Sequence, residues 1–443
     1  MKTLYPFQVK GLERMHDCNK VAFYWDMGLG KSLVGITKAR MMEAKRVLIV
    51  CQKSKLDDWY DVVKDESHYM PMDLRSRTDL LLFVNPNYDD YIGCVGIINY
   101  DLVWRRTELE ALNRIPFTLI LDESSEIQNE KAKRTKFILN SLKPANVILL
   151  SGTPVGGKYE NLWSQLRLLG LPMTAWQFRQ KFVNYRDLYL GNRIVKIVDP
   201  KHPYKRVGEL KRLMGSLNCD FLKTEDVLEL PEQRDILVEC GTPMQFYMFM
   251  KTDMVTIKDW KTGEYVEMDT ENVLTKRLRA SQICSIYNED KFQRFEDLLK
   301  STNDRLVVFY RFQEEYERLQ SIAQSLKKPV SAINGSTKDL DAYENEGDSV
   351  TLVQYQAGAM GLNLQKASKC IFFSLTDSSN LYEQARKRIH RIGQRNTCTY
   401  WIFKCRDGID DGVYKALMRK ADYTNDLFIK DSQTWAKRVS RTR

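Results

Sequence analysis

The stretch VAFYWDMGLGKS, residues 21–32, decides the fold because it joins an apolar strand directly to a glycine-rich loop. In such a loop the glycines let backbone N–H groups face a phosphate, a lysine neutralises its charge, and a hydroxyl holds magnesium. Lys31 is therefore expected to reach the β- and γ-phosphates of a nucleotide, and Ser32 to bind Mg²⁺. The strict loop pattern has a glycine where this chain has Trp25. A strand-to-helix turn without a ligand is thus the alternative for this stretch alone.

Short apolar strands alternate with helical stretches around that loop, which is the pattern of a parallel sheet covered on both faces. The first set of predicted strands comprises residues 21–25, 47–51, 95–99, 118–122 and 146–151. The second set comprises residues 305–310, 349–355, 370–375 and 399–403. A long, mixed and largely helical region separates the two sets. The predicted fold class is α/β, with two similar parallel-sheet lobes that carry helical insertions.

Two prolines mark the expected boundary between the lobes. Pro231 and Pro243 bracket a hinge, and EQRDILVEC between them is expected to be the first strand of the second half. We predict a first lobe over residues 1–232 with an insertion at about 159–230. We predict a second lobe over residues 233–443 with an insertion at about 243–303 and a helical, basic C-terminal tail.

Composition excludes several classes of protein. The 443 residues suffice for two or three domains, and 43% hydrophobic with 28% charged residues is ordinary for a soluble protein. The sequence has no apolar run of membrane-spanning length and no apolar signal core at its start. Nine scattered cysteines without a CxxC pair, with only four histidines, exclude a zinc framework and a disulfide scaffold. We expect buried thiols in a reducing cytosol, and no membrane partner.

The net charge of +10 is spread unevenly. Residues 172–212 hold ten basic residues against three acids, residues 384–395 five against none, and residues 430–443 five against one. Clustered positive charge favours a polyanionic partner, and a solvated basic face is the alternative for each cluster. Charge alone does not choose between DNA, RNA and neither.

An acidic pair and a hydroxyl-rich turn follow two of the predicted strands. Asp122 and Glu123 end an apolar strand, where Asp122 can hold magnesium through water and Glu123 can polarise an attacking water. SGTP, residues 151–154, follows the next strand, and its hydroxyls can bond the magnesium shell and relay its state. The alternatives are a plain acidic surface turn and an ordinary Gly-Thr-Pro turn.

QARKRIHRIGQ, residues 384–394, places Arg388 and Arg391 three positions apart on one face of a predicted helix. Ile389 and Ile392 are expected to form its packed face, which gives the arginines a defined direction. Two permanently charged forks suit a surface that closes over the phosphates held by Lys31. One chain is thus expected to build both walls of a nucleotide cleft, as a motor does. The alternative is a solvated basic helix.

AGAMGLNL, residues 357–364, precedes that run. Its glycines permit a close backbone approach to the phosphate of ATP or of a nucleic acid. A tight helix start without a ligand is the alternative.

Taken together, these motifs resemble those of superfamily-two helicases, and specifically the Swi/Snf branch of double-stranded DNA translocases. The resemblance covers nearly the whole chain in the right order. PFQVKGLERM resembles the adenine-reading motif, DMGLGKS the phosphate loop, LILDESSEIQN the magnesium motif, and LLSGTPVGGKYENLWSQLRLL the coupling motif with its following helix. VVFYRF, INGST, AGAMGLNL and QARKRIHRIGQ resemble the motifs of the second lobe.

The resemblance implies two tandem RecA-like lobes and a set of residue roles, with ATP and Mg²⁺ as cofactors. Asp122 would bind magnesium together with Ser32, and Glu123 would activate water. Arg388 and Arg391 would be arginine fingers, with Gln384 sensing the γ-phosphate. The remaining nucleotide-binding residues would be Gln8, Asp26, Met27, Gly28, Leu29, Gly30, Lys31 and Ser32, with Gly361 at the nucleotide or the tracked strand.

The chain departs from the family pattern in three places. Ser125 stands where the family has histidine after Asp-Glu-Ala, which puts in doubt how tightly hydrolysis is coupled to DNA. Trp25 and Asp26 replace the usual Asp-Glu before the loop. LTDSSNLYEQ replaces a Trp-Asn-Pro segment, so no DNA wedge is expected there.

The expected function is an ATP-driven motor on double-stranded DNA that binds the backbone largely independently of sequence. A strand-separating DNA or RNA helicase of the same superfamily is one alternative, and a nucleotide-regulated nucleic-acid clamp that does not move is another. We expect a stand-alone, monomeric bacterial or phage enzyme in the cytoplasm. The sequence does not indicate its protein partners or its pathway.

Overall fold

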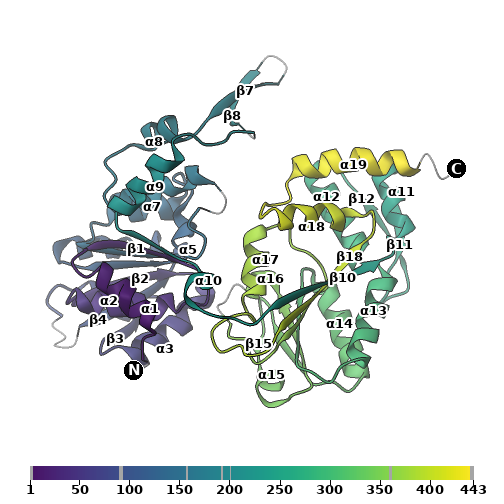
Figure 1. The fold of residues 1–443 in the computed structure, drawn as a ribbon, viewed down its shortest axis with the longest axis horizontal. Helices are drawn as coiled ribbons and strands as arrows, with labels where there is room; N and C mark the ends of the chain where they lie inside the picture. The colour runs from purple at the N-terminus through teal and green to yellow at the C-terminus, as the bar shows by residue number, and fades with distance from the viewer. Residues whose placement is uncertain are drawn as a thin grey trace. The chain divides into compact units, whose positions relative to one another are not determined.

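The computed structural model describes residues 3–88, 93–155, 158–190, 193–199, 201–358 and 362–439. The chain divides into two compact units, Met1–Leu228 and Glu229–Arg443. Each unit is built around its own seven-stranded sheet (Figure 1). The two units thus have the α/β class and the parallel-sheet cores that the sequence predicts. The predicted lobe boundary, after residue 232, falls just inside the second unit.

The first unit has an entirely parallel sheet in the order β3-β4-β2-β5-β6-β1-β9. Its strands are β1 (Lys20–Trp25), β2 (Arg46–Cys51), β3 (Met70–Asp73), β4 (Cys94–Asn99), β5 (Thr118–Asp122), β6 (Asn146–Leu150) and β9 (Cys219–Leu222). The five predicted strands are confirmed, whereas β3 and β9 at the two edges were not predicted. Both edge strands have only four residues, too few for a clear alternation of apolar and polar positions.

Helices cover both faces of this sheet. Along β1, Ala22 and Tyr24 belong to one buried apolar cluster, while Phe23 and Trp25 belong to the other. The strand is therefore buried on both sides, as parallel strands between helical layers are. The helices are α1 (Pro6–Arg14), α2 (Lys31–Met41), α3 (Leu56–Glu66), α4 (Arg77–Val84), α5 (Tyr100–Val103), α6 (Lys133–Lys136), α7 (Trp163–Leu168), α8 (Ala175–Phe182), α9 (Val207–Ser216) and α10 (Thr224–Val227).

The insertion of the first unit is less helical than predicted. It includes an antiparallel hairpin of β7 (Tyr185–Leu190) and β8 (Arg193–Val198), which extends from α8 away from the main sheet (Figure 1). Its chain then returns to the sheet as β9. The hairpin strands are rich in β-branched and aromatic residues, which favour extended pairing over helix.

The second unit has the sheet order β10-β18-β17-β13-β16-β14-β15, parallel except for the short edge strand β15. Its strands are β10 (Gln233–Cys240), β13 (Leu306–Tyr310), β14 (Val330–Ile333), β15 (Lys338–Asp339), β16 (Val350–Gln354), β17 (Lys369–Phe372) and β18 (Cys398–Cys405). The predicted first strand of this half is confirmed as β10. The other four predicted strands are also confirmed.

Helices and a second hairpin complete this unit. The helices are α11 (Met244–Thr252), α12 (Val273–Ser285), α13 (Glu289–Lys300), α14 (Gln313–Ser325), α15 (Asp341–Asn345), α16 (Tyr355–Gly358), α17 (Ser379–Arg386), α18 (Ile409–Met418) and α19 (Asn425–Val439). The hairpin of β11 (Met254–Lys258) and β12 (Tyr265–Asp269) lies between α11 and α12. A fully buried Lys291 joins α13 to α18 through Asp410, with 2.8 Å between Nζ and Oδ2. Burial opposes its charge, but the carboxylate raises the lysine pKa above its usual value.

Two predictions from composition can be compared with the structure. All nine cysteines are free thiols, and eight are buried, with Cys18 partly exposed. None of the described helices combines the length and the apolar character that a membrane crossing needs.

Candidate nucleotide site and arginine loop

The loop after β1 begins α2 in the way the sequence predicts. Gly30 is the N-cap of α2 and adopts φ 75°, a left-handed conformation that glycine tolerates best. A Cβ at Gly30 would also collide with the side-chain amide of Gln8. That amide donates to the Leu29 carbonyl at 2.9 Å, and the Tyr5 N–H donates to its oxygen at 2.9 Å. The buried Gln8 therefore braces the loop from α1.

Lys31 lies over the start of the same loop. Its ammonium donates to the carbonyls of Trp25 at 3.0 Å and Asp26 at 3.2 Å. A positive charge is thus held at the N-terminus of α2, where the first backbone N–H groups of a helix have no partner within it, and this arrangement suits a phosphate. Asp26 in turn accepts hydrogen bonds from the N–H and the hydroxyl of Thr224, at 3.1 and 3.3 Å. The phosphate loop is therefore tied to the segment that follows β9.

Trp25, the residue in place of the usual glycine, has a structural environment. Its side chain is fully buried, and its indole N–H donates to Asp220 at 2.7 Å. Arg14 of α1 pairs with the same carboxylate at 2.8 Å. A Cβ at Gly11 would overlap the indole ring, so α1 packs directly on it. Trp25 thus links β1 to α1 and β9 rather than facing a ligand.

The acidic pair follows β5 at the same sheet edge. Asp122 accepts from the indole N–H of Trp59 at 2.8 Å and from the backbone N–H of Glu123 at 3.1 Å. Tyr100 donates its hydroxyl to the Asp122 carbonyl at 2.9 Å. Glu123 itself adopts φ 49°, a conformation that costs energy in a residue with a Cβ. Several hydrogen bonds therefore fix the orientation of Asp122, and Glu123 is held in a strained backbone conformation beside it.

The SGTP turn after β6 contacts both of the other motifs. Ser151 donates its hydroxyl to Glu123 Oε2 at 3.5 Å and accepts from the Thr153 N–H at 3.2 Å. A Cβ on Gly152 would come within 2.8 Å of Met27 Cγ in the phosphate loop. Because β5, β6 and β1 are neighbours in a parallel sheet, their carboxyl ends meet at one edge. The structure thus brings together the phosphate loop, the acidic pair and the SGTP turn.

The sequence reasoning missed a buried glutamine behind this edge. Gln165 of α7 accepts hydrogen bonds from the Ser124 hydroxyl at 2.7 Å and the Tyr24 hydroxyl at 3.1 Å. Its amide donates to the Pro154 carbonyl at 2.7 Å. The only available signal was a pair of adjacent polar residues, Ser164 and Gln165, among the leucines of the helix that follows SGTP.

The arginine run of the second unit is not a continuous helix, so that prediction is wrong. Helix α17 ends at Arg386, and Arg388 and Arg391 lie in the irregular segment that follows. Arg391 donates to the Leu362 carbonyl at 3.1 Å, and burial lowers its pKa. Gln384 lies in the last turn of α17 and is buried, as is Arg388. The structure therefore groups Gln384 and the two arginines within one unit.

Gln394 holds the loop that follows α17. Its amide nitrogen donates to the carbonyls of Gln365, Ala367 and Ile389, at 3.2, 2.8 and 3.1 Å. Its oxygen accepts from the N–H groups of residues 395 and 396, at 3.0 and 2.9 Å. These bonds pair backbone groups of the loop itself and carbonyls of the segment at 365–367, and so hold the loop against that segment. Ile389 is fully buried, as predicted, whereas Ile392 is only half-buried.

Another arginine of the run has a defined position, whereas one predicted site residue outside the run is not among the described residues. Arg386 pairs with Asp235 of β10 at 2.8 Å and lies 4.1 Å from the ring centroid of Tyr400. It therefore has a structural role. Gly361 lies outside the described residues.

The predicted basic cluster at 172–212 is partly neutralised by ion pairs. Arg179 pairs with Glu130 at 3.0 Å, and Lys181 pairs with Glu209. The exposed basic residues that form no ion pair with the described part of the chain are Arg186, Lys196, Lys201, Lys205, Arg206, Lys211 and Arg212. Most of the cluster's positive charge therefore remains available to a polyanion.

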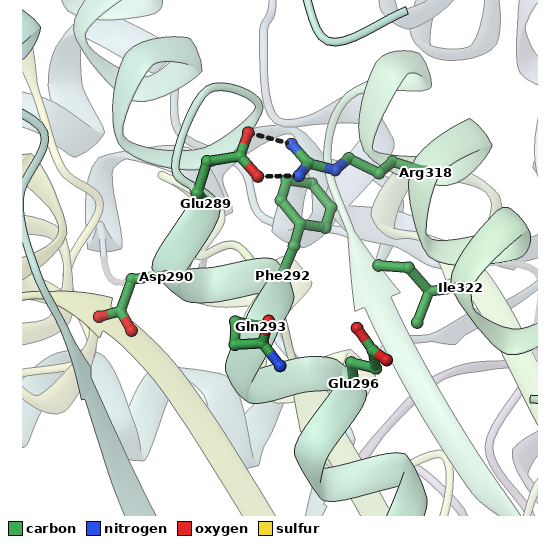
Figure 2. Close-up of a pocket in the computed structure, with 7 residues that line it drawn as sticks. All are labelled: Glu289, Asp290, Phe292, Gln293, Glu296, Arg318 and Ile322. Carbon is green, nitrogen blue, oxygen red and sulfur yellow. Dashed lines mark hydrogen bonds and ion pairs between the residues drawn. The ribbon is translucent and has the colours of Figure 1, made fainter.

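A pocket of about 450 Å³ lies between α13 and α14 of the second unit (Figure 2). Arg318 pairs with Glu289 across it and lies 3.9 Å from the ring centroid of Phe292. Two other acids of this pocket also have basic partners on α13, Asp290 with Arg294 and Glu296 with Lys300. Because these charges are satisfied within the unit, we assign no chemistry to this pocket.

Comparison with known proteins places these features in a family. Residues 7–288, more than half of the chain, match the SNF2-related domain, and residues 290–393 match the helicase conserved C-terminal domain. A Caenorhabditis elegans protein, the SWI/SNF-related matrix-associated actin-dependent regulator of chromatin subfamily A-like protein 1 homolog, is 24% identical over 95% of this chain and 61% of its own length. The human DNA annealing helicase and endonuclease ZRANB3 is 24% identical over 95% of this chain and 40% of its own length.

Two microbial proteins are similar over more of their own length. The uncharacterized ATP-dependent helicase YqhH of Bacillus subtilis (strain 168) is 22% identical over 93% of this chain and 76% of its own length. The Sulfolobus solfataricus SWI2/SNF2 ATPase core, solved in complex with double-stranded DNA, is 20% identical with a TM-score of 0.45, covering 98% of this chain and 95% of that one. With both domain matches in order along the sequence, the chain belongs to the SNF2-related ATPases of helicase superfamily two.

Proposed function

We propose that this ATPase is a motor that moves along double-stranded DNA and hydrolyses ATP with the residues grouped above. The observation that carries the proposal is the contact between three motifs at one sheet edge. Ser151 bonds Glu123, and Gly152 packs against Met27 of the phosphate loop. A change at the phosphates therefore has a direct route to the hydrolytic acid.

In this proposal, Lys31 and the loop N–H groups hold the β- and γ-phosphates, and Gln8 braces the loop beside the base. Mg²⁺ would be held by Ser32 and Asp122 and would neutralise phosphate charge. The donor set fits, because Mg²⁺ prefers hydroxyl and carboxylate oxygens, and each Asp122 oxygen accepts only one hydrogen bond from the described residues. Glu123 orients and polarises the attacking water.

We further propose that Arg388 and Arg391 neutralise the charge that develops on the phosphates, while Gln384 senses the γ-phosphate. Guanidinium groups suit this task because they stay charged even when buried. Membership of the family supports these assignments, and so does the presence of all three side chains in one segment of the second unit. Cycles of ATP binding and release would then drive movement.

Double-stranded DNA is the proposed track. The exposed basic residues of the 172–212 segment offer charge on an open surface, which suits contact with phosphates rather than with base edges. Duplexes of unrelated sequence should therefore stimulate ATP turnover equally, and single strands less. Affinity for duplex should fall with salt, with a log–log slope of about −0.9 per phosphate neutralised.

The decisive experiment pairs two substrates. With ATP, the protein should displace a triplex-forming third strand from a duplex, yet release no single strand from a forked duplex. The matched control is Glu123→Gln, which should displace nothing while still binding DNA. Efficient release of strands from the fork, or stimulation by RNA alone, would identify a strand-separating helicase instead. A rate of ATP hydrolysis that does not change when duplex DNA is added would contradict the motor proposal.

A further inference from the structure

Gln165 is the centre of a buried polar cluster behind the hydrolytic edge of the first unit. The residue is fully buried, and so is Ser124, whose hydroxyl donates to Gln165 Oε1 at 2.7 Å. The same oxygen accepts from Tyr24 at 3.1 Å, and the Gln165 amide donates to Pro154 at 2.7 Å. Buried polar groups are costly unless bonded, so this arrangement holds its members in one geometry.

The cluster forms a second bridge between the two loops that carry the chemistry. The first bridge is the bond from Ser151 to Glu123, which is long at 3.5 Å. The second runs from Ser124, the residue after Glu123, through Gln165 to Pro154 in the SGTP turn. The β5 and β6 loops are thus joined at the acid itself and at the residue that follows it. Of the two bridges, the one through Gln165 has the shorter hydrogen bonds.

The backbone of Glu123 is strained, and the bridge through Gln165 holds it in that conformation. Glu123 adopts φ 49° and ψ 59°, a left-handed conformation that a residue with a Cβ adopts only under constraint. Ser124 is the next residue, so its bond to Gln165 anchors the chain immediately after the strained position. Without that anchor the turn would gain freedom to relax, and the Glu123 carboxylate would move.

We propose that Gln165 is a positioning residue for ATP hydrolysis, which fixes Glu123 through Ser124 and couples it to the SGTP turn through Pro154. It does not touch the nucleotide. Its loss should therefore lower the rate of the chemical step and leave nucleotide affinity nearly unchanged. The proposal rests on the assignment of Glu123 as the hydrolytic acid, but not on DNA as the track.

The test replaces Gln165 with methionine, which has a similar volume and shape but makes no comparable hydrogen bonds. We expect kcat for ATP to fall about 10-fold, because two bonds of the bridge are lost, while KM changes by less than about twofold. Tyr24→Phe is the matched control, because it removes one bond to Gln165 but leaves the bridge from Ser124 to Pro154. Its kcat should stay within about twofold of the native value. The melting temperature of each variant, measured in parallel, separates stability from positioning.

A double-mutant cycle with Ser124→Ala provides the second readout. Ser124→Ala should lower kcat alone, and the double variant should lose little more than Gln165→Met. If Gln165→Met does not fold, Ser124→Ala still tests the same bond by removing only one hydroxyl. Equal kcat losses in Gln165→Met and Tyr24→Phe, or additive losses in the cycle, would overturn the proposal. Turnover is measured without DNA as well, so a failure of duplex stimulation contradicts the motor proposal only.

Discussion

The charged residues of the proposed site lie in two regions that are held in place differently. The phosphate edge of the first unit comprises residues 26–32, 122–123 and 151–154, and the arginine loop of the second unit comprises residues 387–394. At the phosphate edge, Asp122 ends the buried strand β5, and Lys31 begins α2 after the short loop that follows β1, so the positions of both follow from the sheet. In the arginine loop, Arg391 follows the end of a helix and is held by a backbone carbonyl. Strand ends therefore provide a rigid platform, whereas the arginine loop depends on a few side-chain bonds such as those of Gln394.

The largest effect is expected at the phosphate edge. Lys31→Ala should abolish ATP hydrolysis, because the loop loses the ammonium held over it by Trp25 and Asp26. Glu123→Gln provides the contrast within the same edge, since it should bind ATP but not cleave it. The measurements are steady-state turnover and equilibrium binding of a fluorescent ATP analogue. Turnover near the native rate in Glu123→Gln would show that this acid is not the hydrolytic one.

The next effect is expected in the arginine loop. Arg388→Ala or Arg391→Ala should lower turnover by about 10³-fold if each acts as an arginine finger. Binding of ATP should change much less, because in the proposed site the phosphates are held by the first unit. Arg294→Ala is a control that removes an exposed guanidinium from α13 and should leave turnover unchanged. If both variants kept their DNA-stimulated turnover, neither arginine would be an arginine finger, and both would have only a structural role.

The same contrast explains what could be predicted from the sequence. Lys31, Asp122 and Ser151 follow apolar strands, and the carboxyl ends of parallel strands share one edge, so their grouping follows from the strand pattern alone. Membership of the family was likewise visible in the order of the motifs. To predict that these three residues lie together, one needs only the local sequence pattern of each strand and the rule that parallel strands end at the same edge.

Long-range polar contacts could not be predicted in this way. Gln165 bonds Ser124 across 41 positions of sequence, and Gln394 bonds carbonyls 27 and 29 positions away. Neither contact leaves a periodic pattern, and helical periodicity wrongly continued α17 through Arg388. The hairpin of β7 and β8 was missed for a similar reason, because its pairing joins two short segments inside a region that otherwise reads as helix.

Loss of the Gln394 side chain is expected to have an intermediate effect. Gln394→Ala should lower the free energy of unfolding of the second unit by about 1–3 kcal/mol, since it leaves buried carbonyls without donors. Turnover should fall as well, by less than in Arg391→Ala, because the arginines remain but their loop is loosened. Chemical denaturation and kcat are measured together. Asn396→Ala, an exposed neighbour that keeps its backbone N–H, is the control and should change neither. A fully stable Gln394→Ala would show that the loop is held by other contacts.

The smallest expected effect concerns Ser125, which lies two residues after Glu123 in the turn that follows β5. Its side chain is half-buried and forms no hydrogen bond with the described residues, so replacing it should alter stability by no more than about 0.5 kcal/mol. A histidine at this position would place an imidazole near Glu123, with one N–H donor and one acceptor in its neutral form. We therefore expect Ser125→His to raise the ratio of duplex-stimulated to basal turnover, by about fivefold if the added coupling is near the low end of the usual range. The measurement is ATP turnover with and without duplex for both proteins, with Ser125→Asn as a control that adds a polar side chain without an imidazole. An unchanged ratio in Ser125→His would mean that coupling to DNA passes through the SGTP turn and does not involve this position.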